Sequence, residues 1–366
     1  MCYTEKNITH SALPRKDLFM KRRRKTSVLR RLLITLLLFL GVMGVLIAVA
    51  ILQPTEANPP PDLSGDTDTE STETSSTEDP VQTVDKETVQ ALAATLFAQQ
   101  EFTAKHMAVY DTKTGAILYE KNAADRITAA STIKLLTALT MLDYVTEDTV
   151  FTVGNEIKLI GSGSSTAKLK KGFTLTVEQA LDALLIPSGN DAAYMIAAHV
   201  GRKLAKDPEI NDKDAVTLFL DKMNDKAESL GVTDSLFTCP DGYPNKTQYT
   251  TASDMMKIAV AAAKNETIRR TTSKTFVTYT MNDGTVLEYT NTNQLIVPSS
   301  SNFYEGLFGL KTGTTNAAGQ CLIAGCDIYG HEVIITIFKS TDRWSDCKKV
   351  IDTATAAISQ AIAVQQ

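Results

Sequence analysis

Strand-like segments stand at both ends of the folded part of this chain and enclose a helical middle, and this order limits the fold more than any other feature. Residues 107–110 and 116–119 flank a turn at 111–115, which predicts a hairpin. Residues 320–325 and 333–338 predict a second hairpin near the end. If these strands join one antiparallel sheet, the helices between them form an inserted lobe. The predicted fold class is therefore α/β (α+β), an antiparallel sheet flanked by helices with an inserted all-helical lobe.

Helical spacing of apolar residues marks the segments between and after these strands. Helices are expected at 131–145, at 177–200 with a break at 187–190, at 211–230, at 250–264 and at 344–361. A further hairpin is expected from 275–279 and 286–289, around the turn at Asn282-Asp283-Gly284.

The N-terminal part has the pattern of a membrane anchor. Residues 1–31 carry ten Lys or Arg against Glu5 and Asp17, and residues 32–52 are apolar and uncharged. As a helix the 21-residue run would be about 31 Å long, enough to cross a bilayer. The basic leader beside it predicts a cytoplasmic N-terminus and a single-pass protein of the cell membrane. The alternatives are secretion after cleavage at Ala48-Val49-Ala50 and nucleic-acid binding by the leader.

An acidic linker is expected to separate this anchor from the folded part. Residues 53–80 hold eight Asp or Glu, ten Ser or Thr and five Pro, with no Lys or Arg. A segment that can bury so little is predicted to be disordered, so we expect a linker at 53–87 and a folded domain at 88–366 outside the membrane. Beyond residue 31 the net charge is −13, which argues against a nucleic-acid partner.

Neither cysteine nor histidine predicts a metal site. The four cysteines expected outside the membrane could form two disulfides or remain buried thiols, and they are Cys239, Cys321, Cys326 and Cys347. Cys321 and Cys326 lie on opposite faces of a predicted strand and are not expected to pair with each other. His331-Glu332 lacks the second histidine of a zinc-peptidase motif, so no metal and no cofactor are expected.

Ser131-Thr132-Ile133-Lys134 carries the strongest signal of chemistry. Residues three apart share a helix face, so the lysine amine can reach the serine hydroxyl and activate it without a histidine. The same spacing occurs at Ser165/Lys168 and at Ser345/Lys348. The first of these reads as an exposed loop and the second lies near the chain end. Ser131 is therefore the predicted nucleophile.

Two later motifs can complete a site. Ser188-Gly189-Asn190 interrupts a helical region, which places a hydroxyl and an amide in a cleft, although an ordinary helix cap would look the same. Lys311-Thr312-Gly313-Thr314 precedes a predicted strand, and an edge strand with an ammonium and two hydroxyls suits a substrate carboxylate. The tripeptide alone is not specific, because Lys113-Thr114-Gly115 repeats it in a hairpin turn.

The three motifs, in this order, resemble those of the serine penicillin-recognising enzymes. The chain is similar to the low-molecular-mass D-alanyl-D-alanine carboxypeptidases, the penicillin-binding proteins of peptidase family S11, over about residues 88–362. The segments that carry the likeness are 129–137, 184–193, 249–254, 291–295 and 309–315 with Ala318-Gly319. Where many members have Pro-His-Gly-Leu, this chain has Pro240-Asp241-Gly242-Tyr243, and the role of that loop is open.

The resemblance implies a β-lactamase/DD-peptidase-like fold and acyl transfer on peptidoglycan stem peptides that end in D-Ala-D-Ala. Ser131 would attack the carbonyl of the penultimate D-alanine. Lys134 would be the general base, with its pKa lowered by nearby Lys311 and by the helix dipole. Ser188 would return the proton to the departing D-alanine, and Asn190 would orient the acyl group.

The resemblance also implies how the substrate is held. The backbone N–H groups of Ser131 and Thr314 would form the oxyanion hole. Lys311, Thr312 and Thr314 would bind the substrate carboxylate, and Gly313 would let the substrate backbone approach. β-Lactams would be covalent inhibitors.

Three other functions fit the same motifs. A D,D-endopeptidase would use the same site. A class A β-lactamase would need a Glu-x-x-Leu-Asn loop, which does not occur between Ser188 and Lys311. A membrane-tethered, penicillin-binding sensor or scaffold is the non-enzymatic alternative, although a dead site would be expected to have lost its serine or lysine.

Overall fold

The computed structural model describes residues 84–244 and 246–365. The predicted basic leader 1–31, the span 32–52 and the linker up to residue 83 lie outside these ranges. Within the described residues, no helix is both long enough and apolar enough to cross a membrane.

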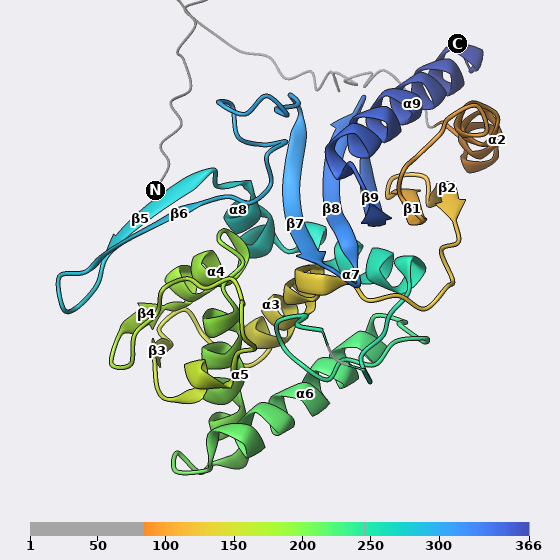
Figure 1. Cartoon of the computed structure of the whole chain (residues 1–366). Helices are drawn as coiled ribbons and strands as arrows, with labels where there is room; N and C mark the ends of the chain where they lie inside the picture. The colour runs from red at the N-terminus through yellow and green to blue at the C-terminus, as the bar shows by residue number, and fades with distance from the viewer. Residues whose placement is uncertain (1–83, 245, 366) are drawn as a thin grey trace, which may run out of the picture. The chain divides into compact units, whose positions relative to one another are not determined.

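The main sheet joins strands from the two ends of the folded region, as predicted. Among the described residues it contains five antiparallel strands in the spatial order β2-β1-β9-β8-β7 (Figure 1). The strands are β1 His106–Asp111, β2 Ala116–Lys121, β7 Leu307–Thr315, β8 Gly319–Ile328 and β9 His331–Ser340. β7, which carries the Lys-Thr-Gly motif, is therefore an edge strand.

Helices cover both faces of this sheet. Because strand side chains alternate between faces, Val333, Ile335 and Ile337 of β9 pack on one side, while Ile334 and Thr336 point to the other. On the first side, α2 packs against α9, and the two lie side by side in Figure 1. On the second side lie α7 and α8. The bounds are α2 Lys86–Phe97, α7 Ala252–Lys264, α8 Glu266–Ser273 and α9 Arg343–Val364.

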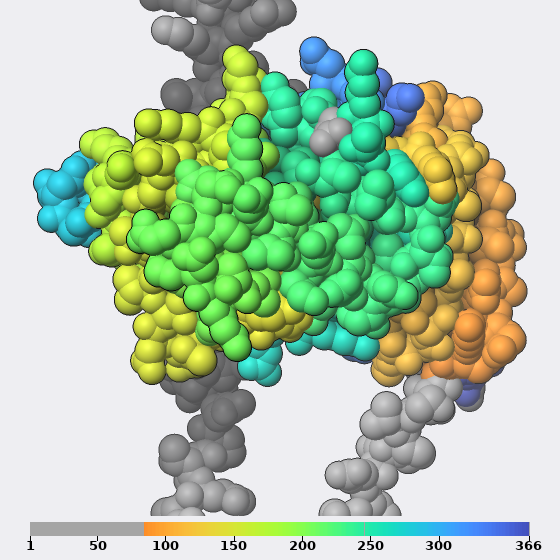
Figure 2. Space-filling view, turned by 90° about the horizontal axis from the view of Figure 1, so that it is seen from below, coloured from red at the N-terminus to blue at the C-terminus, as the bar shows by residue number. Residues whose placement is uncertain are grey.

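The inserted lobe is built around α3, whose residues 134–141 are all buried. Its helices are α3 Lys134–Leu142, α4 Val177–Leu185, α5 Asn190–Ala205 and α6 Asp212–Ser229. Polar caps set their starts: Thr176 and Gln179 form a capping box on α4, and Asn211 caps α6. The lobe forms much of the face shown in Figure 2, with α6 in green across its centre.

Two small hairpins lie outside the main sheet. The predicted strands near 275–289 form a separate two-stranded sheet, β5 Phe276–Thr280 with β6 Val286–Thr290, so they do not extend the main sheet. Lys274 and Tyr279 tie this hairpin to the buried Asp182 of α4. The other pair, β3 Val150–Thr152 with β4 Thr174–Thr176, was not predicted, and neither was α8.

The four cysteines of the described region are free thiols and all are buried. Cys321 and Cys326 face opposite sides of β8, as predicted. Burial raises the pKa of Cys239 and of Cys321 to about 12, which keeps both as neutral thiols.

Candidate active site

Ser131 lies at the junction of the sheet and the helical lobe. It belongs to a short 3-10 turn, Ala130–Ile133, that leads directly into α3, so the predicted helix begins with a tighter turn. The preceding Ala130 has a φ of 47°, in the left-handed region that costs a residue with a side chain about 1–2 kcal/mol. Burial of Ala130 and Ile133 holds this strained entry in place.

Lys134 is fully buried beneath the serine. Its Nζ donates to Ser131 Oγ at 3.0 Å, to Asn190 Oδ1 at 2.7 Å and to the backbone oxygen of Asp241 at 2.7 Å. The three acceptors come from three separate segments. The ammonium therefore joins the predicted serine, the predicted asparagine and a loop that the motifs did not include.

Burial lowers the pKa of Lys134 to about 8, although the charge of Asp241 acts in the opposite direction. With a pKa of 8, about a tenth of the groups are neutral at pH 7, compared with roughly one in three thousand at the ordinary value. The lowered pKa was expected from the sequence. Its main cause, however, is burial, and not the charge of Lys311 or the helix dipole that the sequence reasoning invokes.

Ser188 and Asn190 occupy the break between α4 and α5. Ser188 has a φ of 64°, and a side chain at Gly189 would put its Cβ 2.6 Å from the Ala183 carbonyl oxygen. Asn190 Nδ2 donates to Ser164 Oγ at 2.8 Å, while its Oδ1 accepts from Lys134. Among the described residues, the Ser188 hydroxyl makes no hydrogen bond.

The loop 161–169 packs against the Ser-Gly-Asn motif, although its Ser165/Lys168 pair is not the predicted nucleophile. Ser165 Oγ donates to the backbone oxygen of Ser188 at 2.6 Å. The buried Asp191 accepts from the N–H groups of Ala167 and Leu169 at 2.8 and 3.0 Å. The segment therefore holds the Ser-Gly-Asn motif instead of supplying a second nucleophile.

Strand β7 packs against the turn that carries Ser131. Lys311 is buried and donates from Nζ to the Thr312 backbone oxygen at 2.9 Å. Burial, and then the charges of Lys134 and Arg343, lower its pKa well below the ordinary value. Gly313 runs against the nucleophile, because a Cβ there would lie 3.0 Å from the Ser131 nitrogen. The predicted Ser–Lys and Lys-Thr-Gly motifs are thus in contact.

The loop Asp241–Tyr243, which departs from the family pattern, also contacts the nucleophile turn. Gly242 has a φ of 78° and approaches the Ala130 carbonyl so closely that no side chain would fit. The Tyr243 ring covers Gly161, and its hydroxyl donates to the Ser162 backbone oxygen at 3.0 Å. This loop therefore braces both the nucleophile turn and the loop 161–169.

Arg343 is a site residue that the sequence reasoning missed. It is the first residue of α9, and its Nη1 donates to the Gly313 backbone oxygen at 2.8 Å and to Thr314 Oγ1 at 3.0 Å. Its charge therefore lies behind the exposed Thr314 hydroxyl. An isolated arginine thirty residues after the motif carries no signal in the sequence.

Ser345, the other rival serine, lies in the first turn of α9. Across residues 84–244 and 246–365, no group of three or more His, Cys, Asp or Glu side chains is placed to hold a metal ion.

A hydroxyl held by a buried, weakly basic amine, between a helical lobe and the edge of an antiparallel sheet, is the arrangement of the penicillin-recognising class of serine acyl-transfer enzymes. The model of the family "D-alanyl-D-alanine carboxypeptidase", Peptidase_S11, matches residues 93–341, and this shows that the chain belongs to that family. The protein is thus a serine peptidase, as its sequence predicted.

Known relatives are similar to this chain in sequence and in fold. A D-alanyl-D-alanine carboxypeptidase of Streptomyces sp. (strain K15) is 33% identical over 65% of this chain and 82% of its own. The crystal structure of the Streptomyces K15 DD-transpeptidase covers 70% of this chain and 98% of its own, with 31% identity and a TM-score of 0.64. Penicillin-binding protein D2 of Listeria monocytogenes, solved with ampicillin bound, has 25% identity and a TM-score of 0.56 over 70% of this chain and 98% of its own.

Proposed function

We propose that this protein is a serine-type D-Ala-D-Ala carboxypeptidase, which removes the terminal D-alanine from peptidoglycan stem peptides. The observation that carries the proposal is the contact of Lys134 Nζ with Ser131 Oγ at 3.0 Å, by an amine whose pKa burial has lowered to about 8. Such an amine can accept the serine proton near neutral pH.

In the acylation step, Ser131 Oγ forms an ester bond with the penultimate D-alanine carbonyl. The Ser131 proton passes to Lys134 Nζ. The peptide bond to the terminal D-alanine breaks, and Ser188 relays the proton to the leaving amine. Asn190, already bonded to Lys134, orients the acyl group. Water then hydrolyses the ester by the reverse proton path and restores the serine.

The edge strand β7 would bind the reacting end of the substrate. The N–H groups of Ser131 and Thr314 would stabilise the oxyanion, a contribution of about 3 kcal/mol for each donor. Lys311, Thr312 and Thr314 would hold the terminal carboxylate. The support is the close approach of Gly313 to the Ser131 backbone, where a Cβ would lie 3.0 Å from the Ser131 nitrogen, because Thr314 is the next residue along β7.

Labelling of the full-length chain with a fluorescent penicillin, read by intact mass, tests the proposal together with D-alanine release from diacetyl-L-Lys-D-Ala-D-Ala. We expect a stable adduct on Ser131 and released D-alanine, and Ser131→Ala should lose both. Retention of either activity by this variant would contradict the assignment of Ser131 as the nucleophile.

The same assay separates the alternatives. Rapid loss of the adduct with hydrolysed penicillin would indicate a β-lactamase, and an adduct without D-alanine release would indicate a sensor or scaffold. Cleavage of cross-linked peptides in preference to pentapeptides would indicate an endopeptidase.

We also propose that residues 32–52 anchor the chain in the cell membrane, with the folded region on the outer side. The support is the uncharged apolar run beside ten basic residues. Carbonate-washed membranes should retain the full chain and release a variant that lacks residues 1–52. Release of both would contradict the anchor, and recovery of a shortened mature chain would indicate signal-peptide cleavage.

A further inference from the structure

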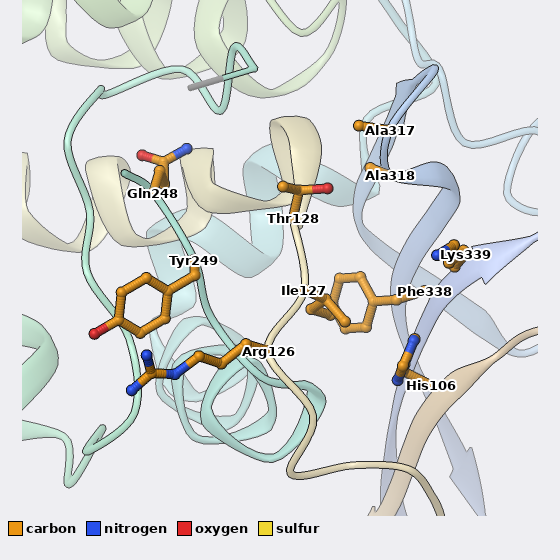
Figure 3. A pocket seen from close by; sticks show the side chains of 10 residues that line it. All are labelled: His106, Arg126, Ile127, Thr128, Gln248, Tyr249, Ala317, Ala318, Phe338 and Lys339. Atoms are coloured by element: carbon orange, nitrogen blue, oxygen red, sulfur yellow. The ribbon is translucent and has the colours of Figure 1, made fainter. Parts of the chain in front are cut away.

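A surface pocket of about 320 Å³ lies beside the catalytic centre, and no motif predicted it. Its lining includes Arg126, Thr128, Tyr249, Ala317 and Lys339, and we call it the basic pocket. The segment 126–128 runs through the middle of the pocket (Figure 3). Tyr249 lies on one side of this segment, and Ala317 and Lys339 lie on the other. The pocket thus joins loops that are far apart in the sequence.

Two of the segments that line the basic pocket lead directly into the active site. Thr128 precedes Ser131 by three residues, which span at most about 10 Å. Ala317 follows Thr314 by the same number. These two segments touch at the site itself, because a Cβ at Gly313 would lie 3.0 Å from the Ser131 nitrogen.

The proposed mode of substrate binding directs the rest of the peptide toward this pocket, and in this respect the inference rests on the proposed function. The terminal carboxylate would lie at Lys311 and Thr312, and the scissile carbonyl at the Thr314 N–H. A chain that extends along β7 in that direction continues past Thr315 to Ala317. The pocket therefore lies on the acyl side of the bond to be cut.

The charge of the pocket points to an anionic ligand. Its described lining residues include Arg126 and Lys339 but no Asp or Glu. Arg126 is already paired with Asp234, and its guanidinium lies 4.0 Å from the centre of the Tyr249 ring. Lys339 has no ion pair among the described residues and its side chain is exposed. Lys339 is thus a cation of the pocket lining that has no ion pair within the described part of the chain.

A β-bulge sets the direction of the Lys339 side chain. Between the pairs Gln320↔Ser340 and Leu322↔Ile337, two residues of β9 oppose one residue of β8. Lys339 has a φ of 54° at this irregularity. Bulges next to active sites turn side chains out of the regular alternation, and here the bulge gives the pocket a lysine at the end of the sheet.

We propose that the basic pocket is the subsite for the acyl-side part of the stem peptide, where Lys339 Nζ binds a carboxylate that precedes the D-Ala-D-Ala end. The ligand class is an extended anionic peptide. The candidate group is the free α-carboxylate of a γ-linked glutamate, which lies two residues before the penultimate alanine.

Two matched peptides test the proposal: L-Ala-γ-D-Glu-L-Lys-D-Ala-D-Ala with a free α-carboxylate on glutamate, and the same peptide with that group amidated. The kcat/KM for D-alanine release is measured on the full-length chain. We expect the wild type to prefer the free acid and Lys339→Gln to lower this preference about two- to five-fold, the range for an exposed ion pair. Lys213→Gln, which removes an exposed charge from α6, should keep the preference.

Ala317→Glu provides a second test, because a carboxylate in the pocket should repel the free acid and also lower the preference. Equal losses on both peptides, or no loss in either variant, would overturn the subsite. Turnover of diacetyl-L-Lys-D-Ala-D-Ala, which ends before the pocket, reports on the catalytic centre. If no variant and no wild-type sample released D-alanine from it, the proposed function would fail and this inference with it.

Discussion

Replacement of Gly242 by alanine should misplace the nucleophile while leaving the fold intact. An alanine Cβ at this position would lie 1.9 Å from the Ala130 carbonyl oxygen and 3.0 Å from the Ser131 nitrogen. Since Cβ atoms essentially never approach closer than 3.0 Å, the two backbones must separate by about 1 Å. The backbone of Ala130 and Ser131 would have to move, and it carries the Ser131 N–H proposed for the oxyanion hole.

A misplacement of about 1 Å at a catalytic centre can lower a rate about a hundred-fold. We therefore expect acylation by penicillin to slow by about two orders of magnitude, equivalent to about 3 kcal/mol in the activation barrier. The second-order rate of covalent labelling measures this directly. Thermal unfolding of the same sample shows whether the protein is still folded.

Gly231 provides the matched control. Its φ of 77° is nearly that of Gly242 at 78°, but nothing lies within 4 Å of a Cβ there. Gly231→Ala should therefore show the same left-handed backbone cost, about 1–2 kcal/mol of stability, with normal labelling. Equal labelling by Gly242→Ala and the wild type, or equal loss in both variants, would refute the positioning argument.

Three further outcomes follow from the geometry. The acylation rate should rise with pH through about 8, as Lys134 loses its proton, and a rate that falls over this range would exclude Lys134 as the base. Tyr243→Phe removes only the hydrogen bond to Ser162, so its rate of penicillin labelling should stay within about five-fold of the wild type. Tyr243→Ala should lower the labelling rate further, because it also removes the ring that covers Gly161, and the labelling kinetics of both variants test this. Arg343→Gln should raise KM for D-Ala-D-Ala peptides about ten-fold, since its guanidinium lies behind Thr314, and an unchanged KM would contradict this.

The elements that could be predicted from sequence are those with local causes. The turns at 111–115 and 282–284 contain glycine and predicted both hairpins correctly. The spacing of Ser131 and Lys134 predicted their contact, because three residues of helix bring two side chains to one face. The break at Pro187-Ser188-Gly189 likewise separates α4 from α5.

Pairings that depend on the whole fold could not be predicted in this way. The hairpin β5–β6 has strand-forming residues, but its sequence does not state which sheet it joins. The short, polar α8 was missed because Glu266–Ser273 has too few apolar residues for a clear helical pattern. The contact of Lys134 with Asp241 uses a backbone oxygen, which every residue has, so no residue type marks it.

The features that would make this centre reactive are also unfavourable for stability, and the surrounding packing has to compensate for them. Ala130 and Ser188 have left-handed backbones, each costing about 1–2 kcal/mol. Lys134 has a pKa of about 8 in the fold and 10.5 outside it, so at pH 7 burial of its charge costs about 3 kcal/mol. Between pH 8 and 10.5, Lys134 binds more protons in the unfolded chain than in the folded one. The cost of burying its charge therefore falls as pH rises from about 8 to 10.5. The buried residues 134–141 of α3 provide packing that compensates for the strained serine turn and the buried amine.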